Sequence, residues 1–235
     1  MKKLIRPIVY LLVFVLAFTG ISANNTYAAT NENANTTKNN QVEFENHIKE
    51  LAKTDQEAKT AYEQYSQLST TDKEKFVELL YSEEYAKALQ AANTLEPGES
   101  KSFHGGDIKA VVTEEETPQN NMNTLGGYYS VSERNVVHKV VVFGIFATIY
   151  WVSVRFKHDY GTRNVTQTLG ADNGHTNINP SIIVSDGVVG HYPAGGWAYG
   201  WGKFRIAATG SIGSWSFTHT LNIKTDNVYT TGWIN

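Results

Sequence analysis

The sequence predicts a mainly β protein: an antiparallel β-sandwich or barrel-like C-terminal domain preceded by a small α-helical N-terminal unit, α+β overall. Three observations lead to this prediction. Residues 41–95 have helix-forming composition and contain no glycine or proline. Residues 128–235 are rich in Val, Ile, Thr and aromatic side chains and show no helical period. The uncharged stretch 140–154 has the composition of a strand.

The same shifts in composition divide the 235 residues into five regions. In chain order we expect a signal peptide (1–28), a disordered segment (29–40), a small helical domain or pro-segment (41–95), a linker with one candidate strand (96–127) and an antiparallel β domain (128–235).

The N-terminus has the pattern of a bacterial secretion signal. Lys2, Lys3 and Arg6 precede an apolar run, and Thr26 and Ala28 supply the small residues of a cleavage site. The alternative is an uncleaved N-terminal anchor. We expect a secreted, extracellular protein, and since the chain has no cysteine its stability must come from packing.

The helical region reads as three or four short helices. Phe44 and Ile48 belong to an approximate apolar stripe, and Thr71 or Asp72 resembles a helix cap. Pro97-Gly98 ends the region. In the following linker, 108–112 is the candidate strand, and the acidic run 114–116 is read as a solvated loop rather than a metal site.

The apolar stretch 140–154 has eight β-branched residues and four aromatic ones, which favour extended backbone. From 152 to 156 apolar and polar residues alternate, as in a strand with one face on a core. We interpret the stretch as the centre of a sheet, with Gly144 marking a bulge or bend. The alternative is a membrane-inserting hairpin formed by 136–143 and 145–157.

Further strands are expected between turn-like sequences. The turns are ADNGH (171–175), SDG (185–187) and GSIGS (210–214). Together with 136–143 and 145–157, the expected strands are 128–132, 164–169, 182–185, 203–209, 214–224 and 228–233.

Three aromatic residues alternate in GGWAYGWGKFRI: Trp197, Tyr199 and Trp201. In a strand all three lie on one face, and they are our candidate ligand-binding residues. The alternative is an aromatic layer within the core. Trp215 and Trp233 are expected in the core.

Catalytic signatures are absent from the sequence. It has no cysteine for thiol chemistry, and no GxSxG, HExxH or phosphate-binding loop. A metal site formed by His158-Asp159, His175 and His191 with Asp172 or Asp186, or by HGGD (104–107), is less well supported than surface roles. We expect no catalytic residue, metal or cofactor.

The charge distribution argues against nucleic-acid binding. Residues 29–103 have eight basic and fourteen acidic residues, and residues 104–235 have nine of each. We therefore expect a secreted non-enzymatic binding protein acting at a cell surface or envelope polymer, with carbohydrate as the candidate partner. The alternatives are an antimicrobial or pore-forming toxin that enters a membrane and carries an N-terminal pro-segment, and an envelope-polymer hydrolase with a site in the loops 158–191.

Overall fold

The computed structural model describes residues 29–116, 129–159, 163–209, 213–226 and 228–234. The predicted signal peptide, residues 117–127 of the predicted linker and residues 210–212 of GSIGS lie outside these ranges. The chain divides into two compact units, 1–35 and 36–235. Apart from the first turns of helix α2, all the described helices and strands belong to the second unit. No helix among the described residues is long and apolar enough to cross a membrane.

Four helices precede the strands: α2 (Ala29–Leu51), α3 (Gln56–Ser66), α4 (Thr70–Leu80) and α5 (Glu83–Ala92). Helix α2 covers the segment 29–40 that composition predicted to be disordered. That segment has no Gly or Pro and continues into the anchored turns around Phe44 and Ile48, which are fully buried. The cap of α4 is Ser69, not Thr71 or Asp72: its side chain accepts from the Asp72 amide.

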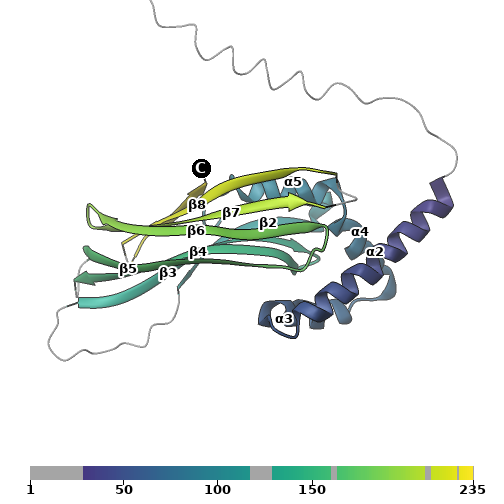
Figure 1. The fold of residues 1–235 in the computed structure, drawn as a ribbon, viewed down its shortest axis with the longest axis horizontal. Coiled ribbons are helices and arrows are strands. Elements are labelled where there is room, and N and C mark those ends of the chain that lie inside the picture. The colour runs from purple at the N-terminus through teal and green to yellow at the C-terminus, as the bar shows by residue number, and fades with distance from the viewer. Residues whose placement is uncertain (1–28, 117–128, 160–162, 210–212, 227, 235) are drawn as a thin grey trace, which may run out of the picture. The chain divides into compact units, whose positions relative to one another are not determined.

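The strands form two antiparallel sheets, so the architecture is a sandwich with open edges and not a barrel (Figure 1). Sheet A has the order β1-β2-β3-β4-β5 and sheet B the order β6-β7-β8-β9. The strands are β1 (Ser100–Phe103), β2 (Ile108–Glu116), β3 (Tyr129–Val142), β4 (Ile145–Asp159), β5 (Val165–Asn177), β6 (Ile182–Ala194), β7 (Trp197–Ala208), β8 (Ser216–Thr225) and β9 (Thr230–Ile234).

Gly144 forms a hairpin turn rather than the predicted bulge or bend. Phe143 and Gly144 connect β3 to β4 with φ angles of 51° and 79°, the backbone of a two-residue type I′ turn. The bulge lies earlier, between Val140 and Val141. Gly195-Gly196 makes the equivalent turn between β6 and β7, with φ of 57° and 81°.

Two predicted turns lie inside strands. ADNGH (171–175) belongs to β5, and SDG (185–187) belongs to β6. A tryptophan explains the first case: the Trp151 ring lies over Gly174, directly opposite it in the neighbouring strand, so that a Cβ added there would be 2.8 Å from the ring. Packing of a large ring over a cross-strand glycine offsets the weak strand preference of that glycine.

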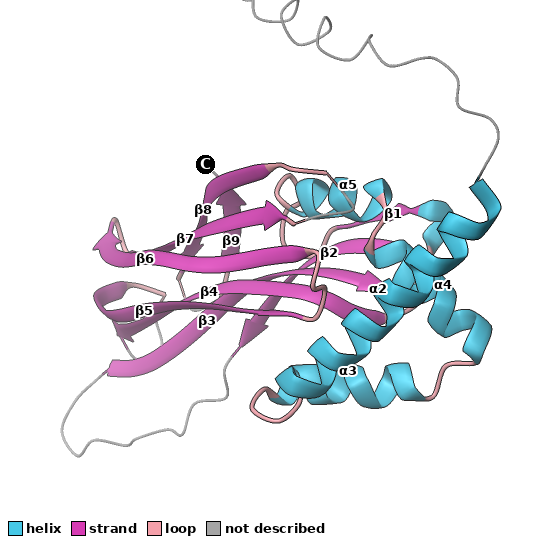
Figure 2. Cartoon of the chain, turned by 45° about the vertical axis from the view of Figure 1, so that its right-hand side comes forward, coloured by secondary structure: helices cyan, strands magenta, loops and turns pink. Residues whose placement is uncertain are grey.

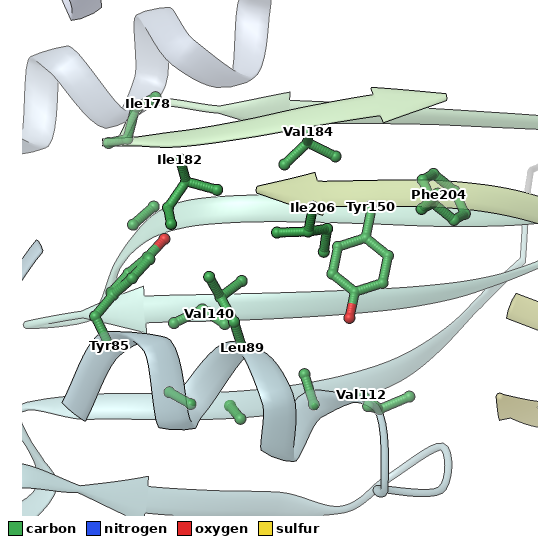
Figure 3. Close-up of a cluster of buried hydrophobic side chains, with 14 of the residues drawn as sticks. Tyr85, Leu89, Val112, Val140, Tyr150, Ile178, Ile182, Val184, Phe204 and Ile206 are labelled. Atoms are coloured by element: carbon green, nitrogen blue, oxygen red, sulfur yellow. The ribbon is translucent and has the colours of Figure 1, made fainter. Parts of the chain in front are cut away.

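The core lies between the sheets, and α5 completes it. Sheet B packs on β3, β4 and β5, and α5 packs on β1, β2 and β3 of sheet A. Tyr85 and Leu89 of α5 point into the same cluster as Val140, Ile182 and Ile206 (Figure 3). Helix α5 therefore covers the part of sheet A that sheet B leaves uncovered.

Most of the stretch 140–154 is buried as predicted. Val140, Val142, Ala147, Tyr150, Val152 and Val154 are fully buried. Glycines on the inner face of sheet B allow the two sheets to approach closely. A Cβ on Gly200 would lie 3.0 Å from Val154, and one on Gly232 would lie 2.7 Å from Val136.

The helices and strands of residues 36–235 share one hydrophobic cluster. Figure 2 shows the helices gathered at one end of the strands. Phe44, Tyr65 and Phe76 form an aromatic group that reaches Phe143 at the β3–β4 turn.

Hydrogen bonds also connect the helices to the strands. The Thr148 hydroxyl donates to Asn177 Oδ1 at 2.7 Å, which leaves its oxygen to accept from the buried Tyr85 hydroxyl, also at 2.7 Å. Asn179, itself fully buried, donates to the Leu80 carbonyl at the end of α4.

Candidate binding face

The aromatic row of β7 lies on the outer face of sheet B. Even-numbered residues of β7 from Ala198 to Ile206 are buried and face sheet A, so the odd-numbered ones face away from it. Trp197, Tyr199 and Trp201 are therefore on one outward face, each partly exposed. The structure thus places the three predicted residues together and outside the core.

Neighbouring side chains hold the rings in place. Tyr192 of β6 stacks on Tyr199 with centroids 4.9 Å apart and planes 4° apart. Trp201 lies over Gly190 as Trp151 does over Gly174. The Lys224 ammonium is 4.3 Å from the Trp197 ring centroid and 5.8 Å from that of Tyr199.

Two aromatic residues extend this face beyond the predicted row. Tyr192 is 51 % exposed and Trp233 of the edge strand β9 is 39 % exposed. The expectation that Trp233 packs in the core was wrong, because Gly232 faces sheet A and so turns Trp233 outward. Trp215 packs against the core with partial burial and stacks on Phe217. We refer to Tyr192, Trp197, Tyr199, Trp201 and Trp233 together as the aromatic face.

The outer surface of sheet B is positively charged. Lys203 and Arg205 continue the odd-numbered row of β7 and are exposed, and Lys224 lies opposite Tyr199. The only carboxylate in β6–β9 is Asp186. Its register partner Phe204 faces the core, and its carboxylate is 2.7 Å from His175 of sheet A.

The histidines considered for a metal site do not assemble into one. His175 pairs with Asp186, whereas His158 contacts Ser132 at 3.0 Å and His191 contacts Thr168 at 2.9 Å. Among the described residues no group of three His, Asp or Glu side chains is arranged to hold a metal.

The HGGD segment and the acidic run form ion pairs. Asp107 binds Lys75 at 2.8 Å and His104 at 3.2 Å, and both partners lower its pKa by favouring the carboxylate. Glu115 binds Lys139 at 2.6 Å, and Glu116 binds Arg134. Residues 114–116 lie in β2 rather than in a loop.

A pocket on sheet A is lined by Glu133, Ser153, Arg155, Gly170, Ala171 and Asp172. Glu133 and Arg155 are directly opposite each other in β3 and β4. Opposite charges at such cross-strand positions favour the pairing of the two strands.

Two histidines that sequence reasoning did not single out lie buried between the sheets. His138 and His219 flank Tyr150, with ring centroids 5.1 and 5.4 Å from it. Burial lowers the pKa of His138 to about 3, with His219 adding to the effect, and lowers that of His219 to about 4. Neither nitrogen of His219 has a hydrogen-bond partner in the described part of the chain.

Comparison with known proteins gives no guide to function: no family model, curated protein or solved structure matches this chain.

Proposed function

We propose that this is a secreted, non-enzymatic binding protein that acts at a cell surface or envelope polymer through the aromatic face. The observation that carries the proposal is the placement of Trp197, Tyr199 and Trp201 on the outer side of sheet B, each partly exposed. A contiguous patch of exposed aromatic side chains, unlike single exposed ones, indicates a surface that contacts another molecule. Flat rings held by their neighbours suit the faces of sugar rings, because little side-chain entropy is lost on binding.

Packing of the apolar stretch disfavours the toxin alternative. The residues that lipid insertion would need, such as Val152 and Val154, are fully buried between the sheets. Loss of a pro-segment that included α5 would uncover the inner face of β2 and break the hydrogen bond between Tyr85 and Thr148. Insertion would therefore require the sandwich to open.

The proposal is tested by binding of the full chain to isolated cell walls and to a glycan array. Trp201→Ala is the test variant and Trp151→Ala is its matched control, because each ring covers a cross-strand glycine on an outer face. We expect Trp201→Ala to weaken binding at least about fivefold, as for an aromatic contact at the centre of an interface. Trp151→Ala should bind like the wild type at a similar cost in stability.

Wild-type binding retained by Trp201→Ala and by Trp197→Ala, with folding confirmed by circular dichroism, would refute the proposed face. Equal loss in Trp201→Ala and Trp151→Ala would mean that binding follows stability rather than the aromatic face.

A further inference from the structure

We propose that the ligand of the aromatic face is an anionic polysaccharide, whose sugar rings contact the aromatic residues and whose acidic groups pair with Lys203, Arg205 and Lys224. This inference rests on the proposed function and adds the charge and polymeric form of the ligand.

The order of residues along β7 carries the first part of the argument. The outward positions read Trp197, Tyr199, Trp201, Lys203 and Arg205, so three rings are followed by two cations on one line. Alternate residues of a strand are about 6.6–6.8 Å apart, which makes the line roughly 27 Å long. A chain of repeating sugar units lying along β7 would meet rings and then cations, whereas a single sugar would meet only one or two.

The neighbouring strand supplies the third cation and polar groups. Lys224 is opposite Tyr199, Thr220 is opposite Lys203, and Thr218 is opposite Arg205. The two threonines face outward beside the cations, where their hydroxyls can both donate to and accept from sugar hydroxyls.

The three cations are not neutralised by an acidic side chain in the part of the chain that the structure describes, although the Lys224 ammonium lies 4.3 Å from the Trp197 ring centroid. None of Lys203, Arg205 and Lys224 forms an ion pair among the described residues. Asp226 is the first acidic residue after β8 in the sequence. It is buried, and its carboxylate accepts hydrogen bonds from the backbone amides of Val228 and Tyr229.

In the strands of sheet A, by contrast, basic and acidic residues are equal in number, six of each, and some cations of sheet A and of the helices form ion pairs. Lys139 binds Glu115, Arg134 binds Glu116 and Lys75 binds Asp107. Among the described strands, the excess of basic over acidic residues is therefore confined to sheet B, which has three cations and one carboxylate. Such a patch attracts anions specifically to this face.

The packing of the rings favours a polymer over a lipid bilayer. Tyr199 lies flat against Tyr192, and Trp201 lies over Gly190. The central rings are thus packed on their neighbours and lie beside the Lys224 ammonium, and they do not form the continuous apolar surface with which proteins enter a membrane.

Titration calorimetry with matched polymer pairs tests this inference. The probes are polygalacturonate and its methyl ester, and dextran sulfate and dextran, since each pair differs in charge on one backbone. Vesicles of phosphatidylglycerol are the lipid arm. We expect the full chain to bind at least one anionic polymer about tenfold or more tightly than its neutral counterpart, with affinity falling as salt rises.

The variant Lys203→Gln/Arg205→Gln/Lys224→Gln should lose that preference. Its control, Lys101→Gln/Lys109→Gln/Lys157→Gln, removes the same charge from sheet A. Lys157 lies over the Tyr129 ring as Lys224 lies over Trp197, which matches the local packing. The control should keep the wild-type preference.

Equal binding to charged and neutral polymers, sensitive to Trp201→Ala, overturns the anionic inference and leaves the proposed function standing. Binding to the vesicles but to no polysaccharide overturns both. Loss of the preference in both triple variants also overturns the inference, because the effect would then come from overall charge.

Discussion

Acidification tests the burial of His138 and His219. Both are neutral in the folded protein, since burial lowers their pKa values from 6.5 to about 3 and about 4. Below about pH 6.5 the unfolded chain binds a proton at each site and the folded protein does not. The contribution of the two neutral histidines to the unfolding free energy is thus fully present above about pH 6.5. It is lost as the pH falls from there towards their pKa values in the folded protein. Between pH 7.5 and 5 the loss is about 2 kcal/mol for each histidine, or about 4 kcal/mol together.

Urea unfolding of the wild type and His219→Phe at pH 7.5 and pH 5 measures this loss. The variant places a third ring beside Phe204 and Phe217 and removes two nitrogens that have no partner in the described structure. We expect its unfolding free energy to fall about 2 kcal/mol less than that of the wild type between the two pH values. The control Phe217→Leu has no titratable group and should lower stability by the same amount at both. An unchanged pH dependence in His219→Phe would refute the burial of a neutral ring.

Two other substitutions test the packing of the sandwich. Gly232→Ala should destabilise the protein by about 1–3 kcal/mol, because the added Cβ would overlap a valine of β3. The control Gly170→Ala should change stability by less than about 0.5 kcal/mol, because the space around Gly170 is open. Thermal unfolding of the two glycine variants measures this difference in stability. An equal loss of stability in Gly232→Ala and Gly170→Ala would contradict the close approach of the two sheets. Tyr85→Phe should lower the unfolding free energy by about 1–2 kcal/mol, because it removes the buried hydrogen bond to Thr148, and the exposed Tyr129→Phe should not. If Tyr85→Phe is as stable as the wild type in urea unfolding, the hydrogen bond from Tyr85 to Thr148 does not hold α5 on the sheet.

The sequence was sufficient to predict the class of fold, because composition and alternation report local preference and burial directly. Val152 and Val154 are a case in point: their alternation with polar residues predicted the buried side of β4 correctly. The lengths of β5 and β6 were underestimated because Gly174 and SDG (185–187) resemble turn residues. Only the cross-strand contact of Gly174 with Trp151 explains its extended backbone, and register is not visible in a single sequence.

The spacing of the three aromatic residues predicted that they share one face, but not which face of the sheet they occupy. Alternation puts Trp197, Tyr199 and Trp201 on one face, and two faces are always available. The glycines between them were the missed signal: Gly200 and Gly202 face sheet A because small residues are needed where the sheets approach closely. Their inward position requires the aromatic rings to face outward.

His138 and His219 could not be recognised as core residues from sequence, because a lone histidine in a strand carries no sign of its burial. The role of α5 was equally hidden. The composition of residues 41–95 predicted helices, but not that α5 would cover the part of sheet A that sheet B leaves open.

The central claim is that the outer face of sheet B is the binding surface, and tryptophan footprinting tests it most directly. The full chain is exposed to hydroxyl radicals with and without a bound polymer such as polygalacturonate, and oxidation of each tryptophan is read by mass spectrometry. The account predicts that the polymer protects Trp197 and Trp201 and leaves Trp151, on the outer face of sheet A, as reactive as before. Protection of Trp151 with no change at Trp197 and Trp201 would contradict it.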